Sequence, residues 1–339
     1  MVSGCPKDRL ALLKERKQQM ENNNFYIVFG PVPSRRLGKS LGINNIPPKI
    51  CTYSCVYCQV GKTLKMNLNR SLFYKTSEVV DSVRDAIVKF RRKNEVIDYL
   101  SFVPDGEPTL DLELGEKIKH LKPLGIKIAV ISNASLIWQE KVRKDLKEAN
   151  WVSLKIDAVS PSVWKKIDRP HPSLKLDEIL AGIEDFSKEF QGDLNTETML
   201  INKLNDNEDE LNQIAKFITN LNIHKSYISI PTRPPTMKWA IPPKPDKITM
   251  AYQIFKSYDL PAECLLGFAV ESFGYTGDIQ RDLLSITSVH PMRESEVNDF
   301  LEKADKNWKD IKHLVDEKKL IRTNFASQNF YIRNFSKAK

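Results

Sequence analysis

Residues 51–58 read CTYSCVYC and place Cys51, Cys55 and Cys58 on one short stretch of chain. Three thiolates this close together can bind three irons of a 4Fe-4S cubane, which leaves the fourth iron without a protein ligand. An iron without a protein ligand is open to a small molecule. The spacing therefore predicts a catalytic iron-sulfur site, and the rest of the chain is interpreted around it.

Closely spaced cysteines also build structural zinc sites, which require four ligands in a tetrahedron. The fourth ligand would have to come from Cys5, Cys264 or a histidine, and none of these belongs to a second CxxC or HxxxH pair. A disulfide is the weaker alternative, because the cysteine count is odd and no secretory signal points to an oxidising compartment. The cluster is the favoured interpretation, and Cys5 and Cys264 have no assigned role.

The chain has 339 residues, 41% of them apolar, which suffices for one large domain and a smaller one. It contains no run of about 18 uncharged apolar residues, so we expect no membrane span. Residues 1–24 mix charges with leucines and lack the apolar core of a signal peptide, which predicts an amphipathic N-terminal helix. These features indicate a cytoplasmic protein, in which thiols stay reduced.

The cysteines lie in a strongly basic part of the chain. From Asn22 to Ser77 there is no Asp or Glu, whereas eight Lys and Arg occur there, namely Arg35, Arg36, Lys39, Lys49, Lys62, Lys65, Arg70 and Lys75. Such a zone can attract an anionic substrate such as a tRNA phosphate backbone. The same cations could instead balance the charge of a thiolate-bound cluster or be solvated.

Apolar, β-branched and aromatic runs recur along the chain with helical patterns between them. The predicted strands are 41–46, 97–103, 126–132, 151–156, 196–201 and 227–230, and helical spacing is found in 79–90, 140–149, 176–190 and 208–221. This alternation indicates βαβ units and a parallel sheet, hence the α/β class. In such folds ligands bind beyond the carboxyl ends of the strands.

The CxxxCxxC motif with the aromatic Tyr57 before its last cysteine resembles the signature of radical S-adenosylmethionine (radical SAM) enzymes. The resemblance implies a partial (β/α)6 TIM-type barrel and two cofactors, a 4Fe-4S cluster and SAM. It also implies an electron donor of the flavodoxin or ferredoxin type. In that family SAM binds the open iron and is cleaved to a 5′-deoxyadenosyl radical.

Polar residues after the predicted strands fit this resemblance. Gly106 and Glu107 are similar to the family's second SAM motif, which meets the methionine amine, although Asp105 stands where the family more often has a first glycine. Ser132 and Asn133 resemble the ribose-contacting position, but Ser-Asn after a strand is also a common helix N-cap.

Lys155 and Asp157 alternate with Leu154 and Ile156, so they share the opposite face of their strand. Charges that point into a small barrel need partners. We therefore assign Lys155 to the SAM carboxylate or a substrate and Asp157 to orienting it, as catalytic candidates. If that face looks outward, the two are a solvated ion pair.

Two further stretches, residues 30–42 and residues 232–235, resemble a largely uncharacterised cytosolic branch related to wybutosine tRNA-modifying radical SAM proteins. Their arginines, Arg35, Arg36 and Arg233, could bind a phosphate or carboxylate of the substrate. They could equally brace the barrel.

The C-terminal part shows a different pattern. Three short helices, 278–287, 293–304 and 308–318, precede a hairpin formed by 320–325 and 329–333, an order that resembles a winged helix-turn-helix. Nucleic-acid binding, peptide binding and structural cover are all open for such a unit. The predicted division is an extension 1–24, a barrel 25–240, a linker 241–277 and a winged-helix-like domain 278–339.

The leading interpretation is a radical SAM enzyme that takes hydrogen from a bound substrate, with tRNA or another nucleic acid ranked first, then a small metabolite, then a peptide. The alternative is an iron-sulfur or zinc regulator whose metal is structural and whose C-terminal unit binds nucleic acid.

Overall fold

The computed structural model describes residues 26–266 and 273–334. The N-terminal helix expected in 1–24, together with Cys5, lies outside these residues. Among the described helices, none combines the length and apolar character needed to cross a membrane.

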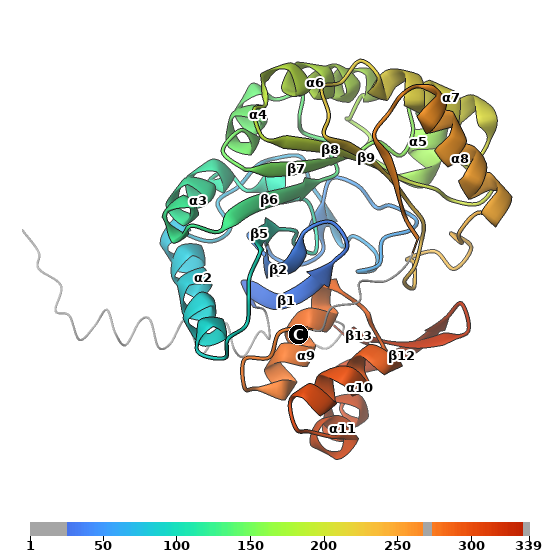
Figure 1. The fold of residues 1–339 in the computed structure, drawn as a ribbon. Helices are drawn as coiled ribbons and strands as arrows, with labels where there is room; N and C mark the ends of the chain where they lie inside the picture. The colour runs from blue at the N-terminus through green and yellow to red at the C-terminus, as the bar shows by residue number, and fades with distance from the viewer. Residues whose placement is uncertain (1–25, 267–272, 335–339) are drawn as a thin grey trace, which may run out of the picture.

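One curved sheet of eight strands forms the centre of the molecule, in the order β1-β2-β5-β6-β7-β8-β9-β10 (Figure 1). Its strands are β1 Val28–Ser34, β2 Gly38–Ile43, β5 Tyr99–Phe102, β6 Lys127–Ser132, β7 Trp151–Lys155, β8 Asp193–Met199, β9 Lys225–Ser229 and β10 Ala262–Leu265. All neighbours are parallel except β1, which pairs antiparallel with β2. A small parallel pair, β3 Ile50–Cys51 and β4 Lys65–Met66, lies in the cysteine region.

The connecting helices lie on the outer side of the curved sheet (Figure 1). They are α2 Thr76–Arg91, α3 Leu114–Leu121, α4 Glu140–Leu146, α5 Pro161–Ile167, α6 Leu176–Glu189, α7 Glu208–Ile218 and α8 Pro245–Ser257, with short 3-10 helices at Pro108–Leu110 and Lys122–Leu124. This arrangement confirms the predicted α/β class, and each of the six predicted strands corresponds to a strand of the sheet.

The two faces of the sheet differ in polarity because side chains alternate along each strand. On β7, Val152 and Leu154 are fully buried in the core between sheet and helices. Lys155 instead lines a cavity on the inner side, as does Ser101 of β5. The helices therefore cover an apolar face, whereas the concave face carries polar and charged side chains alongside apolar ones such as Ile131 and Met199.

The sequence did not predict the two outer strands. β1 contains Pro31 and Pro33, which are tolerated because it is an edge strand with an irregular register beside β2. β10 and α8 fall in 241–277, which the sequence predicted to be a linker. Pro245 stands in the first turn of α8, where a helix accepts proline, so the proline-rich stretch begins a helix rather than excluding one.

The C-terminal unit follows as α9 Ile279–Val289, β11 Met292–Arg293, α10 Glu294–Lys303, α11 Trp308–Asp316, β12 Leu320–Phe325 and β13 Gln328–Arg333. Its three strands form an antiparallel sheet in the order β11-β13-β12. The unit has its own apolar core, against which Tyr26 and Val32 pack from the main domain. The predicted helices and hairpin are present, and the winged-helix assignment stays a prediction.

Candidate functional site

A cavity of about 380 Å³ opens on the concave side of the sheet. It is lined by nearly all the residues singled out from the sequence, namely Arg35, Arg36, Cys51, Cys55, Tyr57, Cys58, Gly106, Glu107, Ser132, Asn133, Lys155 and Arg233. Asp157 is not part of the lining, but it contacts Tyr57 and Lys155, which are. The volume is in the range of small-molecule sites.

The cysteine loop is held on both sides by backbone hydrogen bonds. On one side, the Val56 amide donates to the carbonyl of Ile167 at the end of α5 (2.9 Å). On the other, Met237 donates to the Val56 carbonyl (2.9 Å), and the Thr236 hydroxyl donates to the Cys58 carbonyl (2.8 Å). The loop geometry therefore depends on segments more than a hundred residues away in the sequence.

The three thiols share one electrostatic environment. Burial, reinforced by the neighbouring carboxylate of Glu107, raises the pKa of Cys51 to about 12. Burial and Asp168, which accepts from the Cys55 thiol at 3.3 Å, raise the pKa of Cys55 well above its ordinary value. Burial and Asp105 raise that of Cys58. These thiols must lose their protons to bind a metal, and iron would supply the positive charge that offsets the cost of burying the thiolates.

This donor set fits a 4Fe-4S cluster. The three cysteines are partly exposed, and all face the one cavity. In the described residues, no three His, Cys, Asp or Glu side chains converge as ligands of a single metal ion. Cubane ligands need not converge, because each thiolate binds a different iron.

Gly106 is required for close packing beneath the cysteine loop. Its φ is +156°, and a Cβ atom there would lie 2.0 Å from the carbonyl oxygen of Ile50, the residue before Cys51. The Glu107 amide donates to the same oxygen at 3.2 Å. The close approach expected at this glycine is therefore made by the cysteine loop itself.

The Glu107 carboxylate is fully buried and its hydrogen bonds are satisfied within the chain. It accepts from the Thr109 hydroxyl (2.6 Å), the Ser132 hydroxyl (2.8 Å) and the backbone amide of Asn133 (2.8 Å). The Asn133 side chain donates to Thr52 at 2.8 Å and contacts the Cys51 sulfur at 3.5 Å. Glu107 thus fixes the turn after β6, which in turn supports the first cysteine.

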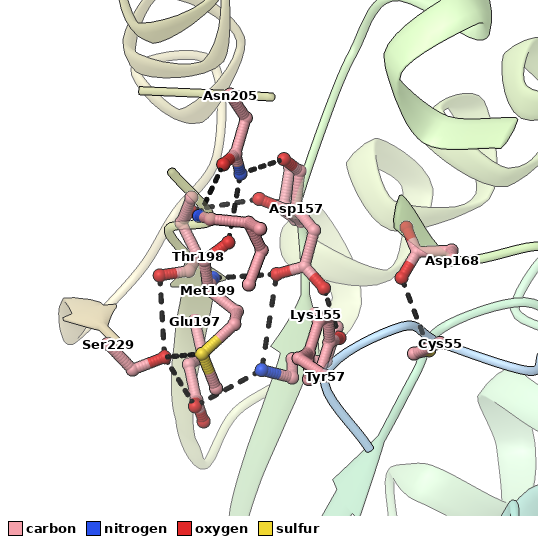
Figure 2. A network of polar contacts seen from close by, with 12 residues as sticks. Cys55, Tyr57, Lys155, Asp157, Asp168, Glu197, Thr198, Met199, Asn205 and Ser229 are labelled. Carbon is pink, nitrogen blue, oxygen red and sulfur yellow. Dashed lines mark hydrogen bonds and ion pairs between the residues drawn. The ribbon is translucent and has the colours of Figure 1, made fainter. Parts of the chain in front are cut away.

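Lys155 and Asp157 face the interior and belong to a network shown in Figure 2. Lys155 Nζ lies 3.2 Å from Glu197 Oε1 and 3.9 Å from Asp157 Oδ1. Asp157 accepts from the Tyr57 hydroxyl and from the backbone amide of Met199 (2.7 Å). The alternative of an outward, solvated pair is wrong, because the two side chains are 17% and 0% exposed.

The charges in this network stabilise one another. Burial alone would raise the pKa of Glu197, but Arg36 and Lys155 outweigh it and the pKa is lowered. Burial alone would lower the pKa of Lys155, but Asp157 and Glu197 raise it. Both groups are therefore charged at neutral pH.

The three arginines differ in their surroundings. Arg36 forms an ion pair with Glu197 and lies over the rings of Trp151 and Tyr227. Arg233 is 9% exposed, donates to the carbonyl of Pro291 at 2.5 Å and lies 3.4 Å from Glu296. Arg35 is exposed and donates to the Leu265 carbonyl at the end of β10. Each of the three arginines therefore stabilises the fold through a bond to another part of the chain.

Sequence reasoning missed several residues of the site. Glu197 lies in a predicted strand, directly opposite Lys155 in the β7/β8 register, and the alternation along that strand could have revealed it. Asp168 follows α5, and His290 follows α9, with no local signal for either. Only the tertiary structure brings these two side chains to the cavity or the cysteines.

The chain is similar in sequence to a known protein family. A family model described as the Radical SAM superfamily matches residues 45–218. A UPF0026 protein of Methanocaldococcus jannaschii is 44% identical over 310 residues, which cover 91% of this chain and 96% of the relative.

Two solved structures resemble the fold at low sequence identity. Streptococcus suis SuiB bound to the precursor peptide SuiA aligns with a TM-score of 0.50 and 11% identity, over 79% of this chain and 55% of that one. A structure of TYW1 with a lysine-pyruvate adduct aligns with a TM-score of 0.42 and 12% identity, over 98% of this chain and 97% of that one.

Proposed function

Because this chain belongs to the radical SAM superfamily, we propose that it holds a 4Fe-4S cluster on Cys51, Cys55 and Cys58 and binds SAM in the adjoining cavity. When bound, the cluster would pass one electron from an external reductant to SAM and so split it into methionine and a 5′-deoxyadenosyl radical, which would take a hydrogen atom from the substrate. The chain is a radical SAM enzyme whose substrate the family leaves open. The proposal rests on three cysteines that line one cavity with polar walls.

The roles of the remaining residues follow from their contacts. Lys155 lines the cavity with its Nζ 5.0 Å from the ring centre of Tyr57, and we assign it to a carboxylate of SAM or of the substrate. Asp157 orients Tyr57 and Lys155. Ser132 and Asn133 stay assigned to the SAM ribose, and Glu107 holds them in place.

Reductive cleavage of SAM tests this proposal. After anaerobic reconstitution, the wild-type enzyme with SAM and dithionite should release 5′-deoxyadenosine, and Cys55→Ala should reduce the release to background. Cys264→Ala is the matched control, because Cys264 lies on β10 outside the cysteine loop, and it should retain wild-type release. No release from the wild type would favour a regulator with a structural metal.

The finer proposal is that the substrate is a nucleic acid such as tRNA. A second segment without Asp or Glu, residues 211–245, packs against the cysteine loop through the hydrogen bonds of Thr236 and Met237. Lys62 and Lys65 follow the cysteine loop in the chain, Lys238 follows Met237, and all three side chains are exposed. Such a basic rim suits a phosphate backbone.

The salt dependence of tRNA binding tests the finer proposal. The slope of log affinity against log salt should decrease by about one for each phosphate contact removed by Lys62→Gln or Lys65→Gln. Lys141→Gln on α4, also exposed, is the control and should leave the slope unchanged. Equal slopes in all variants would remove nucleic acid as the ligand of this rim, whereas the SAM cleavage assay would be unaffected.

A further inference from the structure

The C-terminal unit supplies part of the cavity wall. Val289 and His290, at the end of α9, line the cavity together with the cysteine loop. Three hydrogen bonds to the main domain hold Val289 and His290 at the cavity. Gln59 Nε2 donates to the Val289 carbonyl (3.2 Å), and Arg233 donates to the Pro291 carbonyl (2.5 Å). Ser285 donates to the Val28 carbonyl of β1 (3.3 Å). The unit is therefore anchored to the main domain on both sides of His290.

The Nε2 atom of His290 is buried and has no hydrogen-bond partner among the residues that the structure describes. Among the other described residues that line the cavity, only Asp105 has a buried side-chain atom without a hydrogen-bond partner. That atom, Oδ2, lies 2.8 Å from Lys49 Nζ in an ion pair. A buried polar atom without a partner is costly, and structures rarely keep one without a reason. A ligand in the cavity would supply the missing partner.

Cations gather around this atom. Burial, with Arg233, Arg35 and Arg293 close by, lowers the pKa of His290 well below its usual value, so the ring is neutral and can donate one N–H. The Glu296 carboxylate lies 3.4 Å from the guanidinium of Arg233 and 3.2 Å from that of Arg293.

Arg35 differs from its two neighbours. In residues 26–266 and 273–334 no carboxylate lies within ion-pair distance of its guanidinium. The nearby Glu197 is already paired with Arg36 and Lys155. Arg35, Arg233 and His290 therefore bring two guanidinium groups and one imidazole to the same side of the cavity.

We propose that Arg35, Arg233 and His290 form a subsite that binds an oxyanion of the substrate, either a carboxylate or a phosphate. The arginines supply the charge and His290 supplies a hydrogen bond from the C-terminal unit, which thereby takes part in substrate recognition. The subsite rests on the proposed function, because the substrate must reach the same cavity as SAM.

Calorimetric titration of the reconstituted enzyme tests the subsite with two probes, inorganic phosphate and succinate. SAM is kept at saturation so that groups assigned to its carboxylate are filled, and chloride keeps the ionic strength constant. One probe should bind, and the preferred probe identifies the oxyanion. Arg35→Gln and His290→Gln should each weaken it at least about tenfold, the cost of a charged or buried hydrogen bond.

Two controls keep the result interpretable. Arg84→Gln removes an exposed arginine of α2 and should bind the probe like the wild type. Arg35 is itself exposed, so its variant should fold even if His290→Gln does not. Binding of neither probe, or unchanged binding in Arg35→Gln, would overturn the subsite. Release of 5′-deoxyadenosine from the same samples without substrate reports separately on the proposed function.

Discussion

The ion pair between Lys155 and Glu197 connects β7 and β8 beneath the cysteine loop, and we expect it to be strongly coupled. Glu197 also pairs with Arg36. It accepts a hydrogen bond from Ser229 at 2.9 Å (Figure 2). Glu197→Gln removes one charge, which leaves Arg36 without its carboxylate partner and Lys155 with only the more distant Asp157, 3.9 Å away. Breaking a buried pair on one side in this way costs about 3–5 kcal/mol of unfolding free energy.

The coupling energy follows from the geometry. Two unit charges 3.2 Å apart attract by about 5 kcal/mol at an effective dielectric constant of about 20. Lys155 keeps 17% of its side chain exposed, so solvent reduces this value. A double-mutant cycle of Lys155→Met and Glu197→Gln should therefore give a coupling of about 1–3 kcal/mol.

Urea denaturation of the four proteins measures the cycle. Lys225 and Glu263 form a matched control, because they also join neighbouring strands but are 41% and 42% exposed. Their cycle, Lys225→Met with Glu263→Gln, should give at most about 1 kcal/mol. If the interior pair couples no more strongly than the surface pair, the reasoning that the barrel interior excludes water from these charges is refuted.

Two further predictions concern other parts of the chain. Gly106→Ala should lower the bound iron per chain, measured after anaerobic reconstitution, because its Cβ would displace the Ile50 carbonyl. Gly125→Ala is the control and should bind iron normally, because Gly125 also has a positive φ but a Cβ there would have no atom within 4 Å. Burial raises the pKa of Asp282 to about 6, so the folded state binds its proton more tightly than the unfolded chain does. The stability that this proton binding adds is complete below pH about 4 and is lost as the pH rises through 6. The unfolding free energy of the wild type, minus that of Asp282→Asn, should therefore fall by about 3 kcal/mol across that range. A flat difference would show that Asp282 titrates normally.

The features that could be predicted from the sequence are those set by the spacing of residues close together in the chain. The cysteine loop occupies a few consecutive residues, and the parallel strands are short apolar runs. Period-two alternation placed Lys155 and Asp157 on the inner face. The two outer strands escaped detection because β1 contains prolines and β10 has only four residues.

The partners of these residues could not be predicted in the same way. Arg233 contacts Glu296 of the C-terminal unit, and Cys55 contacts Asp168, each across a long sequence separation. Glu107 illustrates a second limit. Its place in the chain was predicted, but its carboxylate already accepts hydrogen bonds from Thr109, Ser132 and Asn133, and only coordinates reveal these contacts.

The charges of the cavity divide it into two regions. Around the cysteines, carboxylates and thiols gather, and Lys155 and Arg36 are matched by Glu197 and Asp157. SAM carries a positive sulfonium, so we expect its reactive end to lie in this region. On the side of the C-terminal unit, Arg35, Arg233 and Arg293 lie close to His290, whose Nε2 has no hydrogen-bond partner in the part of the chain that the structure describes. An anionic substrate group bound there would be attracted to the arginines and kept away from the carboxylates near the cysteines. Electrostatics alone would then orient the substrate with its reacting carbon toward SAM, which is the arrangement that hydrogen transfer requires.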